Sequence, residues 1–286
     1  MVSSSPLPLH LPATFLVGLL SLGPLSACGS PVGVEVAVVQ ELSFIREEPE
    51  GISDAFDLDG RESDADDPEG CYVSDLVDLE GNAGIDNAFS NILPALELTE
   101  AAALEPLIQA AIDEGRLLLM LEMAGLDARD QDDCVDLRLS RGLGPPALGG
   151  DGKLLPGQTF DRAPDAPESL MSCADLREGV LTGRPLDMRL PLQVFDESID
   201  ISMFDGIFEI ELLPEFGYRG RFAGGIDIVE LMDNVYSFDG VGDEVPSLLE
   251  TVLDANADLA PDASGVCRRL SVAFRFDAVS AYFFED

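Results

Sequence analysis

Residues 199–212 read IDISMFDGIFEIEL, and this stretch carries the strongest indication of the fold. Apolar side chains occupy every second position up to Met203 and again from Phe208 onward, with polar or acidic residues between them. Alternation with a period of two is typical of a strand that buries one face. Asp205-Gly206 separates the two runs, and this pair favours a tight turn because both residues accept positive φ. We therefore expect a β-hairpin that turns at Asp205-Gly206.

Other stretches of the chain show the same alternation and predict further strands. They are residues 34–39, 135–139, 186–194 and 270–276. Pro191 has no N–H to donate, so its strand is expected at a sheet edge or with a bulge. Strands with one wet face belong to antiparallel sheets, and several must close on each other to bury the apolar face. The predicted fold class is mainly β, an antiparallel β-sandwich or jelly-roll-like domain.

A few short helices are expected beside these strands. The first follows the capping pair Asp86-Asn87 and is limited by Pro94. The second places apolar residues on one helix face and ends at Gly115. The helical stretches after the first are residues 104–112, 227–234 and 246–254.

The domain expected from these elements is a single β-rich unit over residues 34–286, with an acidic loop region at 41–86. Residues 142–167 are rich in glycine and proline and are expected to form exposed loops. A division into two domains at this loop stretch is the alternative.

The charge balance excludes several classes of partner and chemistry. Asp and Glu number 55 against 16 Lys and Arg, which gives a formal net charge of -39. Nucleic acid is therefore not an expected partner, because its phosphates would be repelled. The one histidine, His10, lies near the N-terminus, so the rest of the chain cannot build a Ser-His-Asp triad or a histidine-ligated zinc site. No catalytic residue is predicted.

The N-terminal region has the features of an export signal. Residues 11–22 form an apolar run that is too short to span roughly 30 Å of hydrocarbon, and a run of this length suits the core of a signal peptide. Leu25-Ser26-Ala27-Cys28 follows, with a branched apolar residue and two small residues before the cysteine. These four residues resemble the lipobox of bacterial lipoproteins.

The resemblance implies where the protein resides. Residues 1–27 would be the signal peptide, Cys28 would carry the lipid, and residues 28–33 would form a lipidated tether. The partner would then be a membrane, reached through the lipid on Cys28. Gly29 in place of Asp implies the outer membrane of the cell envelope.

Cysteine count agrees with export. With Cys28 assigned to lipid, four cysteines remain, an even number for an oxidising compartment. These disulfide candidates are Cys71, Cys134, Cys173 and Cys267. Two disulfides are expected in one of three connectivities, and four reduced cysteines are the alternative.

The acidic loop region is the candidate metal site. In residues 54–69, eight of sixteen residues are acidic, and carboxylates at this density repel one another unless they are solvated or bridged by a cation. Calcium suits them because it takes six to eight oxygen ligands in flexible geometry. The stretch resembles the Asp-rich calcium loops of thrombospondin type 3 repeats, which implies a structural ion. The candidate ligands in this stretch are Asp57, Asp59, Asp64 and Asp66. A second stretch partly matches an EF-hand loop that precedes a helix, and its residues at positions one, three, five and nine are further candidate ligands: Asp78, Glu80, Asn82 and Asp86.

Three functions remain compatible with the sequence. The first is a non-enzymatic, lipid-anchored protein of the cell envelope with structural calcium in its acidic loops. The second is a carbohydrate- or protein-binding surface module, in which calcium would help to form the ligand site. The third is a carboxylate-dependent hydrolase, since glycosidases need only two well-placed acids. An acidic linker without a bound ion is the alternative to the calcium site.

Overall fold

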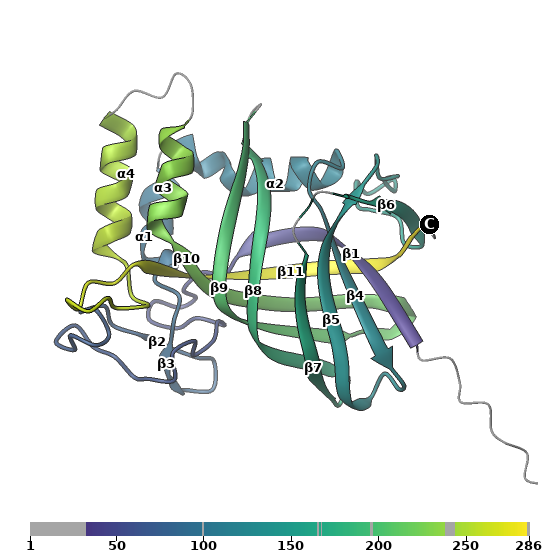
Figure 1. The fold of residues 1–286 in the computed structure, drawn as a ribbon, viewed down its shortest axis with the longest axis horizontal. Coiled ribbons are helices and arrows are strands. Elements are labelled where there is room, and N and C mark those ends of the chain that lie inside the picture. Colours follow the sequence, from purple (N-terminus) through teal and green to yellow (C-terminus); the bar gives the residue numbers. More distant parts are fainter. Residues whose placement is uncertain are drawn as a thin grey trace, which may run out of the picture. The chain divides into compact units, whose positions relative to one another are not determined.

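Eight antiparallel strands close into a barrel (Figure 1). The computed structural model describes residues 33–98, 100–164, 166, 168–194, 197–237 and 244–284. Around the ring the strands are β1 (Gly33–Phe44), β4 (Leu118–Leu126), β5 (Gln131–Leu143), β7 (Ser169–Arg177), β8 (Val180–Val194), β9 (Glu197–Leu212), β10 (Gly217–Asp227) and β11 (Arg269–Phe283). The short β6 (Gln158–Arg162) pairs with the end of β5 and runs parallel to β11.

Strand β1 closes the ring by pairing on both sides. Residues 33–38 pair with β4, and residues 37–44 pair with β11. The mainly β, antiparallel class expected from the sequence is confirmed, but a sandwich or jelly roll is wrong. Alternation along a strand shows which side chains face inward, and it leaves open whether the sheet curls into a ring or packs on a second sheet.

The predicted hairpin at Asp205-Gly206 is also wrong, because β9 runs through this pair as one strand along β8. Asp205 has a φ of 54°, and the β8–β9 register shifts on either side of Leu186, which pairs with Gly206. A Cβ on Gly206 would lie 2.7 Å from the carbonyl oxygen of Leu186 and 2.9 Å from that of Ala223. The Asp-Gly pair therefore forms a bulge, which bends the strand where three backbones approach closely.

The remaining predicted strands are confirmed as parts of β1, β5, β8 and β11. Pro191 lies in the part of β8 that pairs with β9 alone, as expected for a residue without an N–H. Strands β4, β7 and β10 have no counterpart in the expectations. The stretch expected as loops, residues 142–167, contains β6.

Four α-helices accompany the barrel in the part of the chain that the structure describes. They are α1 (Phe89–Leu96), α2 (Leu104–Asp113), α3 (Ile228–Tyr236) and α4 (Glu244–Ala255), with short 3-10 helices η1 (Glu100–Ala103) and η2 (Pro214–Phe216). The cap predicted at Asp86-Asn87 is wrong. Ala88 is the N-cap of α1, and the Asn87 amide instead donates to the Ile45 carbonyl and the Ser53 hydroxyl. None of the described helices has the length and apolar character that crossing a bilayer requires.

Aromatic side chains fill the interior of the barrel. The rings of Phe208 and Phe222 stack with their centroids 5.4 Å apart, and Phe222 stacks on Phe274 at 5.0 Å. Helix α2 contacts both β1 and β8, which stand on opposite sides of the ring, so it lies across one opening. Its residues Ile108 and Ile112 are buried in the same core as the aromatic rings.

Two disulfides are present, and both use the cysteines predicted to pair. Cys134–Cys173 joins β5 to β7, and Cys71–Cys267 joins the acidic loop region to the segment before β11. The predicted signal peptide, Cys28 and most of the tether lie outside the described residues.

Candidate functional site

The barrel interior is a packed core in the part of the chain that the structure describes. The cavity lined by Leu119, Leu139 and Met188 measures about 10 Å³. A cavity of this size has room for about one water molecule. Candidate sites therefore lie on the outer surface of the barrel.

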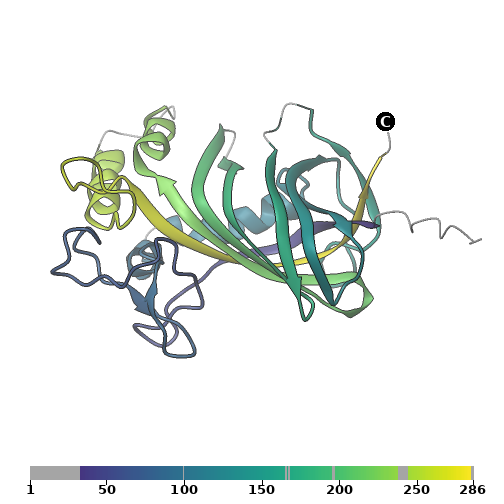
Figure 2. The ribbon, with the colours of Figure 1, turned by 60° about the horizontal axis from the view of Figure 1, so that its bottom comes forward.

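The acidic loop region lies against the outer surface of β10 and β11. Buried residues Ile45 and Leu76 pack on Ala223 of β10 and Ala273 of β11. The short strands β2 (Leu76–Val77) and β3 (Ala83–Ile85) pair within the region. In Figures 1 and 2 these loops lie beside one end of the barrel. The region is thus part of the folded domain.

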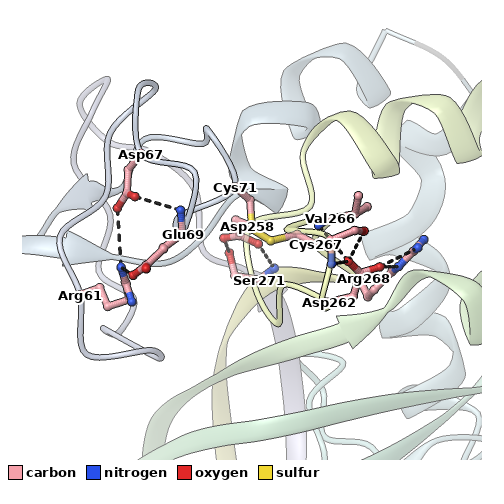
Figure 3. Close-up of a disulfide and its surroundings, with 11 residues drawn as sticks. Arg61, Asp67, Glu69, Cys71, Asp258, Asp262, Val266, Cys267, Arg268 and Ser271 are labelled. Carbon is pink, nitrogen blue, oxygen red and sulfur yellow. Dashed lines mark hydrogen bonds and ion pairs between the residues drawn. A yellow bond between two sulfur atoms is a disulfide. The ribbon is translucent and has the colours of Figure 1, made fainter.

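Ion pairs and a disulfide hold this region in place. Asp54 pairs with Arg221 of β10 and, at 2.8 Å, with Arg275 of β11. The Arg221 guanidinium also lies 4.6 Å from the centre of the Phe56 ring. Farther along, Cys71 bonds to Cys267 beside the buried Asp258–Ser271 pair (Figure 3). Residues 54–71 are therefore attached to β10 and β11 at one end and to the segment before β11 at the other.

Asp57, Asp59 and Asp86 converge in this anchored region. Each offers a carboxylate oxygen within 4.8 Å of the other two. An isolated bridge between Phe56 and Asp86 brings the two segments together, with the Asp86 N–H donating to the Phe56 carbonyl at 2.9 Å. The Leu58 N–H in turn donates to Oδ2 of Asp86 at 2.6 Å. Sequence patterning proposed these three residues from two separate stretches, and the fold brings them together.

Gly84 allows the two segments to approach this closely. Its φ is +89°, and a Cβ added there would lie 2.4 Å from the carbonyl oxygen of Arg61. Any other residue at this position would clash with the 57–61 loop and would also adopt a disfavoured backbone conformation. Gly84 is therefore required for the loop carrying Asp57 and Asp59 to lie near Asp86.

The environment of Asp59 and Asp86 disfavours their charged forms. Burial raises the pKa of Asp86 to about 8, and the negative charges of Asp258, Asp59 and Asp75 add to the effect. The pKa of Asp59 is also raised, mainly by burial. Among the described residues none of the three forms an ion pair with a basic side chain. A bound cation would compensate these charges and favour the ionised carboxylates.

The other predicted ligands lie outside this group. Asp78 and Asn82 form a turn between β2 and β3, in which the Asn82 side chain donates to Oδ2 of Asp78 at 2.7 Å and lowers its pKa. Glu80 is exposed in the same turn. Asp64 accepts a hydrogen bond from the Asp66 N–H, and both residues are exposed.

Two further acids near the group were not proposed from the sequence, the half-buried Asp75 and the buried Asp258. Burial raises the pKa of Asp75 to about 6, and its carboxylate accepts a hydrogen bond from the Ser63 N–H at 2.5 Å. Asp258 is 5% exposed, and its pKa is raised to about 7 by burial. Their spacing in the sequence resembles that of the many exposed acids, so no pattern distinguishes them.

A second set of possible ligands consists of Cys134, Asp136 and Cys173 on β5 and β7. Both cysteines are in a disulfide, so they have no thiolate to offer a metal. Asp57, Asp59 and Asp86 are thus the described carboxylates best placed to share an ion. Their oxygen donors suit a hard cation such as calcium.

Comparison with known proteins adds no functional information. No family model matches the chain, and neither a curated protein nor a solved structure does.

Proposed function

We propose that this chain is an exported lipoprotein of the cell envelope, anchored to the outer membrane by lipid on Cys28, whose barrel domain carries a structural calcium ion. The proposal assigns it no catalytic residue. The lipobox-like residues 25–28 support the anchor, and the two disulfides agree with folding in an oxidising compartment.

The observation that carries the calcium proposal is the convergence of Asp57, Asp59 and Asp86, none of which forms an ion pair with a basic side chain among the described residues. Three carboxylates supply from three to six oxygens, and calcium takes the remainder of its ligands from carbonyls or water. The ion would bridge the 57–59 loop to Asp86, three residues before α1, and hold the acidic loop region on the barrel.

Calorimetric titration of calcium into the chelator-treated protein tests this site, with thermal unfolding followed in parallel. We expect micromolar binding, and at about a hundredfold excess over Kd a rise in Tm of roughly 5–10 °C. The triple variant Asp57→Asn, Asp59→Asn and Asp86→Asn should show neither effect, because amides bind calcium far more weakly than carboxylates.

The matched control is the double variant Asp64→Asn and Asp66→Asn, which removes two exposed carboxylates from the same loop region but leaves the group intact. It should bind calcium like the wild type. An equal loss of calcium affinity in both variants would show that binding depends only on the total negative charge of the region. No heat and no change in Tm for the wild type would overturn the calcium proposal.

Mass spectrometry of the N-terminal peptide from bacterially expressed protein tests the lipid anchor. We expect a chain that begins at Cys28 and carries diacylglycerol, and a membrane-bound protein that detergent releases. Cys28→Ser should abolish the modification. Recovery of wild-type protein with an unmodified Cys28 would contradict the anchor while leaving the calcium site untouched.

A further inference from the structure

A cleft on the outer surface of the barrel shares only Asp59 with the group of three carboxylates. Its volume is about 480 Å³, within the range of small-molecule sites. Strands β8, β9 and β10 supply its floor, and the acidic loop region and the loop before β11 supply its walls. The lining residues are Leu58, Asp59, Arg184, Pro185, Phe204, Asp205, Gly225, Leu259, Ala260 and Arg269.

The cleft lies where three neighbouring strands depart from regular pairing. The β8–β9 register shifts between Gly183 and Met188, and the β9–β10 register shifts between Ala223 and Gly225. Bulges of this kind redirect side chains and are enriched beside functional sites. The regular ladder above and below the cleft shows that the sheet is interrupted locally.

Two lining residues hold a conformation that non-glycine residues rarely adopt. Asp205 has a φ of 54°, and Ala260 has a φ of 56°. Such residues are strained, and they cluster at functional sites, where the surrounding structure holds them in place. Their strained backbone conformations indicate that the fold holds the shape of the cleft.

Gly225 makes room for the polar side of the cleft. A Cβ at this position would lie 3.1 Å from Cδ of Arg269 and 3.2 Å from Cδ1 of Leu259. The Arg269 guanidinium lies 4.4 Å from the centre of the Phe204 ring and pairs with Asp205 at 2.6 Å. Arg269 is therefore held in place by Phe204 and Asp205, and the Asp205 carboxylate neutralises part of its charge.

Arg184 is the available cation of this cleft. Within the described part of the chain it forms no ion pair, although the chain has more than three acidic residues for every basic one. Arg184 is exposed in β8, next to Pro185 at the cleft border. A guanidinium of this kind binds a carboxylate through two parallel hydrogen bonds. Leu58, Phe204 and Leu259 offer apolar surface beside it.

We propose that this cleft binds a small organic carboxylate with an apolar body, whose carboxylate pairs with Arg184 and whose body lies against Phe204 and Leu259. The negative field of the whole protein repels free anions, so the apolar contact and the guanidinium must act together. The site does not depend on the calcium proposal, because Arg184 and Phe204 are not among the candidate calcium ligands.

Ligand-observed fluorine NMR with 4-fluorophenylacetate tests the site, and 4-fluorophenylacetamide is the uncharged probe of the same shape. Both titrations are run with calcium and with a chelator, so a failure of the calcium site cannot hide binding here. We expect saturable binding of the acid and binding of the amide at least about tenfold weaker, the loss that one charge-assisted hydrogen bond produces.

Arg184→Gln should weaken binding of the acid by about tenfold or more and leave the amide unaffected. Arg189→Gln is the matched control, since Arg189 is an exposed arginine of the same strand that lies outside the cleft and forms no ion pair among the described residues. It should bind like the wild type. Equal affinity for acid and amide, equal loss in both variants, or no binding in either buffer would overturn the proposal.

Discussion

At the scale of single residues, the protein keeps acids where water does not reach them. Asp258 accepts a hydrogen bond from the Ser271 N–H at 2.7 Å and another from the Ser271 hydroxyl, which itself accepts the Ala88 N–H. These bonds favour the charged carboxylate, yet burial dominates and raises the pKa of Asp258 to about 7. Asp258 and Asp86 are thus neutral more often than surface acids at the same pH.

Replacing Asp258 with Asn should change how stability depends on pH. The folded-state pKa is about 7, against a reference value of 3.8, so the folded protein binds more protons between these values. The free energy of unfolding therefore falls as pH rises from about 4 to about 7, by roughly 2–4 kcal/mol for this group. The Asp258→Asn variant should lose this contribution of Asp258 to the decrease in the free energy of unfolding. Urea unfolding at pH 5 and pH 8 with a chelator measures it.

Asp75 and Asp86 also have raised pKa values, so the pH dependence of the Asp258→Asn variant should become shallower without disappearing. Asp64→Asn, at an exposed position, should keep the full wild-type dependence. An unchanged slope in Asp258→Asn would mean that Asp258 stays ionised in the folded protein.

At the scale of elements, the sequence identifies a strand best when one face is wet and the other dry. The strands β5 and β8 show this alternation and were predicted. Strand β11 was predicted from its alternating sequence, although residues 270–274 are buried on both faces. Strand β4 reads LLMLEMAGL and buries residues 118–121 on both faces, so its sequence has no period of two. Strand β10 contains four glycines, and a Cβ on one of them, Gly220, would lie 2.4 Å from Cζ of Phe276. A glycine required by a neighbouring ring is indistinguishable from a loop glycine in the sequence.

The hairpin prediction failed for a related reason. Asp-Gly is favoured wherever both residues need positive φ or close backbone approach, and a bulge requires this as much as a turn does. Asp205 and Gly206 meet that requirement inside β9, against the carbonyls of two neighbouring strands. A hairpin turn and a bulge differ in whether the strand continues past the Asp-Gly pair along the same neighbour. The local sequence does not encode this difference.

For the candidate metal residues, too, the sequence predicts part of the site and the tertiary fold provides the rest. The step Asp57-Leu58-Asp59 could be proposed from its spacing, and Asp86 from a separate stretch. The three carboxylates come together because Phe56 and Asp86 form a β-bridge and because Gly84 has no Cβ to clash with the 57–61 loop. Both contacts are made only in the tertiary fold. Arg184 and Phe204 lie in different strands and meet at the cleft only after β8 and β9 pair.

At the scale of the whole molecule, the two disulfides close loops of very different length. Cys71 and Cys267 are separated by 196 residues, and Cys134 and Cys173 by 39. A cross-link stabilises the folded state mainly by restricting the unfolded chain, and it does so more for longer loops. The Cys71–Cys267 bond also borders the small core formed by α1, α3 and α4.

Removal of each disulfide should therefore have an unequal cost. The double variant Cys71→Ser and Cys267→Ser should lose about 5 kcal/mol of the free energy of unfolding, and Cys134→Ser with Cys173→Ser about 4 kcal/mol. Denaturant unfolding of both variants under non-reducing conditions gives the comparison. A larger loss for the Cys134–Cys173 variant would show that native-state contacts, and not chain entropy, set the order.

The pairing of β1 with β11 determines when the barrel can close during synthesis. β1 leaves the ribosome first among the described strands and β11 last, yet each completes the other's ladder. While the chain is being synthesised, β1 therefore has only β4 to pair with, and the ring stays open until β11 arrives. A nascent chain that can finish its barrel only with its final strand cannot complete its fold before synthesis ends, since the long-range closure is the slow step.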